Sequence, residues 1–225
     1  MKQRRNTSPN IIFLVLAYAI LFFPYRFYFR AKFFRDKQLL SKLGEDNRPV
    51  IVVFNHTSLL DIPSVGLCVG LPLLRKISFP AKKELFDHRL SRWLVPIMGI
   101  IPIDRSATDI SAARSILAVL KEGRAVVISP EGTRGFSYDV QPLQIGFIKM
   151  AHKANALILP IGIHGAAKAL PRNASFPKPH KLTLRVGDPI DIAEHLNSDG
   201  NNHNYEAVAE IIRQKMTELI TVPER

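Results

Sequence analysis

A histidine and an aspartate stand five positions apart in the stretch FNHTSLLDIP, residues 54–63, between two apolar runs. If His56 precedes a helix and Asp61 lies in its first turn, the carboxylate can accept a hydrogen bond from one imidazole nitrogen. That bond would fix the tautomer and leave the other nitrogen available to take a proton, as a general base does. A purely structural interpretation stays open, because Ser58 and Asp61 also match a helix-capping pattern loosely.

A general base of this kind needs a nucleophile. The chain contains no Gly-x-Ser-x-Gly motif, and its one cysteine, Cys68, stands in the apolar context VGLCVG without basic neighbours. We therefore expect that a hydroxyl group of the substrate is deprotonated by His56 and attacks an acyl carbon directly.

Short apolar runs rich in β-forming residues alternate with helical segments from about residue 49 onward. The expected strands are 49–54, 76–79, 99–103, 124–129, 156–163 and 181–187, and the expected helices are roughly 58–70, 83–95, 107–121, 143–154 and 204–220. Several strands are apolar on successive positions, which is typical of strands covered on both faces. The pattern predicts a single α/β domain with a largely parallel or mixed sheet flanked by helices.

Three polar stretches follow directly after expected strands. They are NHTSLLD at 55–61, Asp104–Arg105, and PEGTRG at 130–135. In sheets of this class, chemistry gathers at the carboxyl ends of the strands, so the coincidence predicts a single site. Taken alone, the second stretch is more often a surface ion pair and the third an ordinary turn.

Four blocks, in order, resemble those of the glycerolipid acyltransferases, specifically the 1-acylglycerol-3-phosphate (lysophosphatidate) acyltransferases. The blocks are NHTSLLD at 55–61, which matches the family's His-x4-Asp motif, GIIPIDR at 99–105, PEGTR at 130–134 and LPIGIHG at 159–165. A KKEL stretch at 82–85 matches a further family feature between the first two blocks. The resemblance covers roughly residues 49–190.

This resemblance implies transfer of a fatty acyl group from the thioester of acyl-CoA or acyl-carrier protein to the 2-hydroxyl of lysophosphatidate, giving phosphatidate. His56 would be the general base and Asp61 its orienting partner, and the family works without a metal or organic cofactor. The implied acceptor-phosphate site comprises Arg105, Glu131, Gly132, Thr133 and Arg134, with Lys82 beside them, and the supporting residues are Asn55, Gly99, Pro130 and Pro160.

Physical chemistry agrees with part of this assignment. An arginine guanidinium grips a phosphate through two hydrogen bonds, whereas a lysine acts as a point charge. Glu131 would repel a phosphate, so we expect it to orient Arg134 or to bind a glycerol hydroxyl. Pro160 is expected only to shape its strand, since proline in a strand usually marks an edge or a bulge.

The net charge of +12 and the pI near 10 require an anionic partner. Residues 1–50 hold ten Lys and Arg against three acids and are also the most hydrophobic part of the chain, which favours a membrane over nucleic acid. The apolar run IIFLVLAYAILFF, residues 11–23, is shorter than the roughly 20 residues that span a bilayer. We expect residues 10–35 to form one or two interfacial helices.

The sequence thus predicts a membrane-anchoring segment, 1–48, before an acyltransferase domain, 49–225. It predicts a monotopic or peripheral protein on the cytoplasmic face of an anionic membrane, from which removal of residues 1–35 would release a folded domain. A signal peptide and a hydrophobic docking helix stay open as alternatives for the N-terminal run. For the function, the alternatives are the same chemistry on another lysolipid, or a non-catalytic basic lipid-binding protein.

Overall fold

The computed structural model of the chain describes residues 10–74, 76–82, 99–103, 109–135, 139–196 and 203–221, apart from the side chains of Lys82 and Asp109. The strands are β1 (Lys32–Phe34), β2 (Val50–Phe54), β3 (Ile77–Lys82), β4 (Ile100–Ile103), β5 (Ala125–Ile128), β6 (Leu157–His164) and β7 (Thr183–Val186). The helices are α1 (Ile11–Phe27), α2 (Lys37–Glu45), α3 (Asp61–Leu74), α6 (Asp109–Leu120), α7 (Gly146–Ala154), α8 (Ala166–Ala169) and α9 (Tyr205–Thr221), with a short 3-10 helix at Ile192–Glu194. The helix expected at 83–95 lies outside the described residues.

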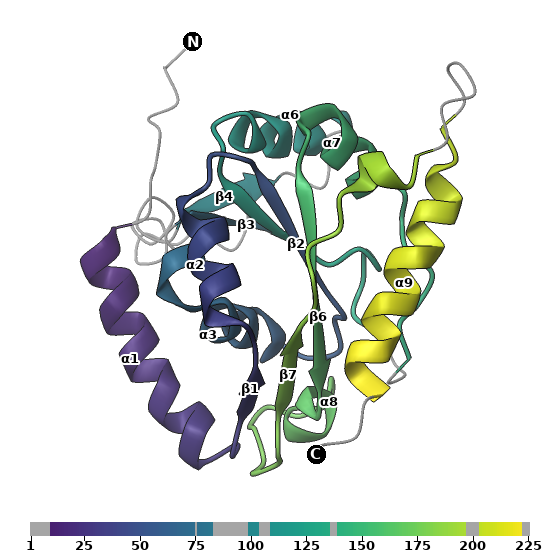
Figure 1. Cartoon of the computed structure of the whole chain (residues 1–225). Coiled ribbons are helices and arrows are strands. Elements are labelled where there is room, and N and C mark those ends of the chain that lie inside the picture. The colour runs from purple at the N-terminus through teal and green to yellow at the C-terminus, as the bar shows by residue number, and fades with distance from the viewer. Residues whose placement is uncertain are drawn as a thin grey trace.

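The described strands form one mixed sheet in the order β1-β7-β6-β2-β5-β3-β4. Strands β2 to β6 run parallel to one another, whereas β7 is antiparallel to β6 and parallel to β1. Helices α1, α2 and α3 cover one face of the sheet, and α6, α7 and α9 cover the other (Figure 1). The predicted α/β domain with a mixed sheet flanked by helices is confirmed.

The central strand β2 is buried on both faces. Val50, Val52 and Phe54 pack into the core under α1, α2 and α3, while Ile51 and Val53 pack into the core on the opposite face. Each buried side chain of this size stabilises the fold by roughly 1.5–3 kcal/mol. The loop that leaves the carboxyl end of β2 therefore starts from one of the most firmly held points of the molecule.

The N-terminal segment contributes more to this core than the sequence predicts. In place of one or two helices over 10–35, the structure has the single helix α1 followed by strand β1, which pairs with β7. Helix α1 packs against α3, and the side chains of Leu14, Tyr25, Phe29 and Ala31 are buried in the core. Removal of residues 1–35 would delete a strand and these core side chains, so the expectation that it releases a folded domain is not consistent with the packing.

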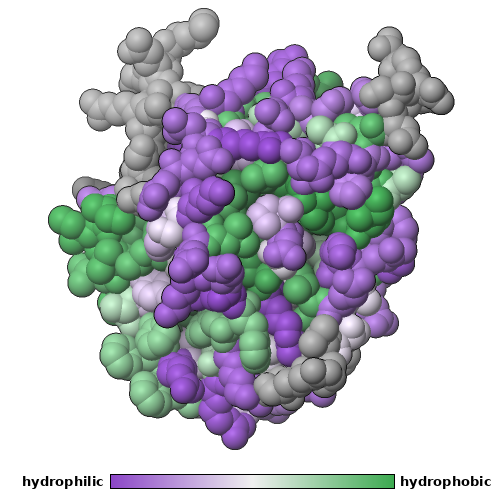
Figure 2. Space-filling model, viewed as in Figure 1, coloured by the Kyte–Doolittle hydropathy of each residue, from purple (hydrophilic) through white to green (hydrophobic). Residues whose placement is uncertain are grey.

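Helix α1 also presents a broad apolar surface to solvent. Its exposed large apolar side chains are Ile11, Ile12, Val15, Leu16, Ile20, Leu21, Phe23 and Phe27, and Figure 2 shows the hydrophobic colour that gathers over this helix. None of the helices in the described part of the chain is both long enough and apolar enough to cross a membrane.

Candidate active site

The predicted His–Asp pair lies at the junction of β2 and α3. His56 follows the end of β2, Asp61 is the first residue of α3, and His56 Nδ1 is 3.0 Å from Asp61 Oδ2. The side chain of Asp61 is fully buried, whereas that of His56 is 18% exposed. Within the described residues, no hydrogen bond engages His56 Nε2, so this nitrogen is available to a ligand.

Asp61 also makes the reciprocal hydrogen bond of a capping box with Ser58 at the start of α3, so the two interpretations of the motif hold together. Its Oδ2 accepts the backbone N–H groups of Thr57 at 2.6 Å and Ser58 at 2.7 Å as well as the imidazole. These contacts on one oxygen fix the orientation of the Asp61 carboxylate toward the histidine.

Asn55 fixes the end of β2 against the neighbouring strand β6. Its side-chain amide donates to the carbonyl oxygen of Ile163 at 2.9 Å and accepts the N–H of Ile163 at 2.7 Å. On the other side, the Phe54 ring packs edge-on against the imidazole of His56, with ring centroids 5.5 Å apart. The supporting role expected for Asn55 thus has a definite geometry, because it ties the residue before His56 to β6.

Glu131 accepts hydrogen bonds from the backbone on both sides of its carboxyl group. Its Oε1 accepts the backbone N–H of His56 at 2.9 Å, and its Oε2 accepts the backbone N–H of Gln141 at 3.3 Å. Burial raises the pKa of this carboxyl, against the opposing effect of the two N–H groups. Both oxygens are engaged by the backbone, so the contacts do not support the expectation that Glu131 orients Arg134 or binds a glycerol hydroxyl.

A second hydrogen bond joins the loop of Glu131 to the backbone of His56. The N–H of Gly135 donates to the His56 carbonyl oxygen at 2.8 Å. Gly132 has a φ of +75°, which favours glycine, and a Cβ there would collide with the side chain of Gln144. The carbonyl of Pro130 accepts the N–H of Gln144 at 2.9 Å and so closes the loop. This loop and the histidine are one rigid unit.

Two further residues of this loop point to solvent. Thr133 is exposed and Arg134 is partly exposed. In the described part of the structure, neither side chain forms a hydrogen bond or an ion pair. The guanidinium of Arg134 has no partner among the described residues and lies in the loop that is hydrogen-bonded to His56, so it is suited to bind an anion.

The remaining phosphate-site candidates are placed only by their backbone or not at all. Lys82 is the last residue of β3 and pairs with Ile103 at the end of β4, and Gly99, with a φ of +64°, accepts the N–H of Phe79 just before β4. The side chain of Lys82 and all of Arg105 lie outside the described residues. Because β2 to β6 are parallel, the ends of all these strands meet at one edge of the sheet, as the sequence predicts.

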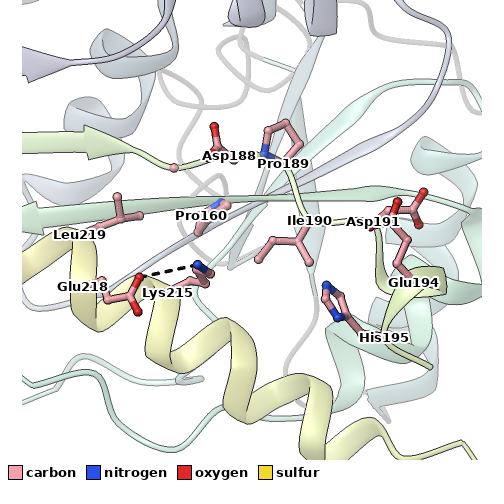
Figure 3. A pocket seen from close by; sticks show the side chains of 11 residues that line it. Pro160, Asp188, Pro189, Ile190, Asp191, Glu194, His195, Lys215, Glu218 and Leu219 are labelled. Carbon is pink, nitrogen blue, oxygen red and sulfur yellow. Dashed lines mark ion pairs between the residues drawn. The ribbon is translucent and has the colours of Figure 1, made fainter. Parts of the chain in front are cut away.

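Pro160 is not part of this site. It lies in β6, an interior strand, beside a bulge in which two residues, 159 and 160, face the three residues 187–189. The N–H of Gly187 donates to the Pro160 carbonyl at 2.9 Å. Figure 3 shows Pro160 lining a cavity of about 290 Å³ next to α9, together with Asp188, Lys215 and Leu219. The bulge, and not a sheet edge, accommodates the missing N–H.

Sequence reasoning missed the contribution of α1 to this site. The Tyr25 hydroxyl donates to the carbonyl of Leu60, the residue before Asp61, at 2.8 Å and lies 3.4 Å from Ser64 Oγ. Burial raises the pKa of Tyr25 to about 12, with the Ser64 hydrogen bond opposing this and the charge of Asp61 adding to it. The one sequence signal for such a contact is the helical spacing of the aromatic residues Tyr18, Phe22 and Tyr25 in α1.

Arg35 contacts α3 at its middle. The helix is interrupted at Gly70, whose φ is +71°, and the Arg35 guanidinium donates to the carbonyls of Leu67 at 2.6 Å and Cys68 at 2.5 Å. Residues of the N-terminal segment therefore hold α3 at its beginning and in its middle, just before the break at Gly70. Among the described residues, no group of three or more His, Cys, Asp or Glu could hold a metal ion.

Known proteins share this sequence pattern. Residues 33–164 match the family model described as Acyltransferase. The chain is 30% identical over 171 residues to the 1-acyl-sn-glycerol-3-phosphate acyltransferase of Bacillus subtilis, with 75% of this chain and 80% of that protein covered. It is 27% identical over 169 residues to a chloroplast 1-acyl-sn-glycerol-3-phosphate acyltransferase of Arabidopsis thaliana, with 68% and 46% covered.

The match to chloroplast proteins is partial, since the chain spans less than half of the length of those from Arabidopsis thaliana and Brassica napus. The fold is shared with the crystal structure of the 1-acyl-sn-glycerophosphate acyltransferase PlsC of Thermotoga maritima, at a TM-score of 0.64 and 23% identity, covering 95% of this chain and 98% of that one. The family model spans more than half of the chain, and the Bacillus relative is matched over most of both lengths. The chain therefore belongs to the acyltransferase family.

Proposed function

We propose that the protein is a 1-acylglycerol-3-phosphate O-acyltransferase. It would move a fatty acyl group from acyl-CoA or acyl-carrier protein to the 2-hydroxyl of lysophosphatidate and so make phosphatidate for phospholipid biosynthesis. The observation that carries the proposal is the 3.0 Å contact between His56 Nδ1 and Asp61 Oδ2 at the parallel strand ends, beside the loop of Arg134. Relatives named for this activity support the choice of substrate.

The chemistry needs no nucleophile from the protein. His56 Nε2 takes the proton of the 2-hydroxyl while the hydroxyl oxygen forms a bond to the carbonyl carbon of the thioester. The π electrons of that carbonyl move to the carbonyl oxygen. The tetrahedral intermediate collapses as the C–S bond breaks, and the leaving thiolate receives the proton from His56. Asp61 stabilises the imidazolium between these two steps, since its buried carboxylate accepts the Nδ1–H.

The acceptor phosphate is proposed to bind at the loop 130–134. Arg134 supplies the guanidinium and Thr133 a hydroxyl donor, with Lys82 and Arg105 expected to approach from the ends of β3 and β4. Supporting this, Glu131 and Gly135 bond the loop to the backbone of His56. A phosphate held by this loop would bring the 2-hydroxyl to the base at a fixed distance, which is how positioning contributes to rate.

The membrane assignment is also a proposal. We infer that α1 lies in the interfacial region of an anionic cytoplasmic leaflet, with its exposed apolar side chains in contact with lipid and residues 1–48 acting as the anchoring segment. The exposed fractions of Ile12, Ile20 and Phe27, 69–72%, support this assignment. The absence of acidic residues before Asp36 supports the choice of an anionic surface.

An acyl-transfer assay with the purified full chain in detergent micelles tests the function. Lysophosphatidate, other lysophospholipids and glycerol 3-phosphate are each offered with acyl-CoA and with acyl-carrier protein, and the products are identified by mass. We expect phosphatidate as the main product. If the acyl group is transferred only to another lysolipid, the proposed chemistry stands and the proposed acceptor is wrong. If the protein binds lipid and transfers no acyl group, it is a non-catalytic lipid-binding protein.

A further inference from the structure

Phe176 lies on the loop 171–180, between α8 and β7, and no assigned role accounts for it. Its side chain is 82% exposed, the largest fraction among the exposed large apolar residues of the described chain. The loop sequence, PRNASFPKPH, combines this aromatic residue with prolines and basic residues. An isolated exposed apolar side chain is unremarkable, so its neighbours decide what it means.

Two hydrogen bonds place this loop between α1 and the catalytic residues. The Tyr28 hydroxyl, at the end of α1, donates to the carbonyl of Pro177 at 2.9 Å. At the start of the loop, the carbonyl of Leu170 accepts the hydroxyl of Ser58 at 2.9 Å. In Figure 1 the loop runs beside the C-terminal end of α1, near α8. The loop thus spans the distance from the proposed membrane helix to the segment that links His56 and Asp61.

Further apolar side chains are exposed on the three segments that these contacts join. On α1 the nearest is Phe27, 72% exposed, one residue before Tyr28. In the catalytic segment, Leu59 is 64% exposed and Ile62 is 44% exposed, each within one residue of a residue that makes one of the contacts described above. Within the described residues, the segment from His56 to Ile62 and the end of α1 therefore both carry exposed apolar side chains.

The charge on the segments of α1 and of the loop has one sign. The exposed charged residues are Arg26, Arg30 and Lys32 in the segment 10–35 and Lys168, Arg172 and Lys178 in the segment 165–187, and neither segment contains an Asp or Glu. The acids gather elsewhere: Asp188, Asp191, Glu194 and Glu218 line the cavity next to α9 (Figure 3). Apolar side chains among cations, with acids excluded, are complementary to an anionic bilayer surface.

We propose that the loop 171–180 is a second membrane contact, in which Phe176 enters the headgroup region of an anionic bilayer beside the C-terminal end of α1. A second contact beside α1 fixes the tilt of the domain, so that His56 faces the leaflet that holds the lysolipid. This inference rests on the proposed function for its lipid substrate. The contact with lipid is independent of turnover and is measured separately.

Site-specific labelling tests the proposal in the full chain. The one cysteine, Cys68, is fully buried, and burial raises its pKa to about 12, so a cysteine introduced at position 176 would be labelled selectively. Phe176→Cys, Ile20→Cys on α1 and Ile110→Cys on α6 each receive an environment-sensitive fluorophore. Ile110 is 60% exposed and belongs to α6, a helix that Figure 1 shows at the end of the molecule opposite the loop, which makes it the matched control.

The labelled proteins are mixed with vesicles of phosphatidylcholine and phosphatidylglycerol that carry lipid-linked quenchers. We expect a blue shift and quenching at positions 20 and 176 and neither at 110. We also expect Phe176→Ser to weaken vesicle binding by about 10-fold, the amount given by exposing one large apolar side chain.

A label at position 176 that stays in water while the label at position 20 enters lipid would overturn the proposal and leave α1 as the contact. Equal quenching at 176 and 110 would also overturn it, because the binding would then have no orientation. Failure to transfer an acyl group counts against the proposed function alone, since the labels report contact with lipid and not turnover.

Discussion

Asp61→Asn separates the two roles of this carboxylate. The asparagine oxygen can still accept the N–H groups of Thr57 and Ser58, which lie 2.6 and 2.7 Å from Asp61 Oδ2. The negative charge beside His56 is lost, so the imidazolium loses its stabilisation. We therefore expect the turn before α3 to survive and the base to fail.

The size of the effect follows from the geometry. At the 3.0 Å between His56 Nδ1 and Asp61 Oδ2, Coulomb's law with an effective dielectric constant of about 20 gives ~5.5 kcal/mol as an upper bound on the stabilisation of the imidazolium. Since ~1.4 kcal/mol corresponds to a tenfold change in rate, we expect kcat to fall by about 10³- to 10⁴-fold. The new amide group occupies the buried position of Oδ1, which has no hydrogen-bond partner among the described residues, at a cost of about 1–3 kcal/mol of stability.

The assay is thiol release from acyl-CoA in the presence of lysophosphatidate, with urea unfolding measured on the same samples. Asp36→Asn is the matched control, because Asp36 caps α2 by accepting the N–H groups of Gln38 and Leu39 and has no histidine partner in the described structure. The control is expected to keep wild-type kcat and stability, since Asn and Asp cap equally well. An Asp61→Asn protein that retains more than about a tenth of wild-type kcat would refute the charge-stabilisation argument.

Three further variants test the surroundings of the pair. Arg134→Ala should raise the acceptor KM by about 10- to 100-fold with kcat little changed, because a charge-assisted contact to phosphate is lost; initial rates over a range of lysophosphatidate concentrations measure this, and an unchanged KM would remove Arg134 from the phosphate site. Glu131 has a native pKa raised by burial, so its carboxyl binds more proton in the native than in the unfolded state between its ordinary and its native pKa. Its contribution to stability must fall as pH rises through that window. The free energy of unfolding in urea, measured for wild type and for Glu131→Gln at several pH values, should therefore fall with pH more steeply for wild type. A wild-type advantage over Glu131→Gln that grows with pH would contradict this expectation. Tyr25→Phe leaves the Leu60 carbonyl without its 2.8 Å donor and should lower the free energy of unfolding by about 1–2 kcal/mol, an expectation that fails if the urea midpoint is unchanged.

The parts of the fold that sequence predicted are those with a local signal. Strand β2 is a continuous apolar run, and all five of its residues are buried, so its position and its burial on both faces follow from Val50–Phe54 alone. Strand β1 has no such signal, because Lys32–Phe34 is three residues long and sits in an aromatic and basic stretch. It is a strand only because it pairs with Thr183–Arg185, about 150 positions later in the chain.

The same distinction applies to the site. His56 and Asp61 are close in sequence, and the strand-to-helix transition between them was sufficient to predict their contact. The role of Glu131 was not predictable, because every residue except proline offers a backbone N–H, so this contact does not depend on the type of residue at position 56. The contact of Tyr25 with the Leu60 carbonyl was missed for the same reason.

The central claim is that His56 is the base that activates the acceptor hydroxyl. Its most direct test is the rate of phosphatidate formation by full-length His56→Ala, with His195→Ala, an exposed histidine next to α9, as control. The account predicts that His56→Ala loses about 10²- to 10⁴-fold in kcat with an unchanged urea midpoint, while His195→Ala matches wild type. A His56→Ala protein that makes phosphatidate at close to the wild-type rate would contradict it.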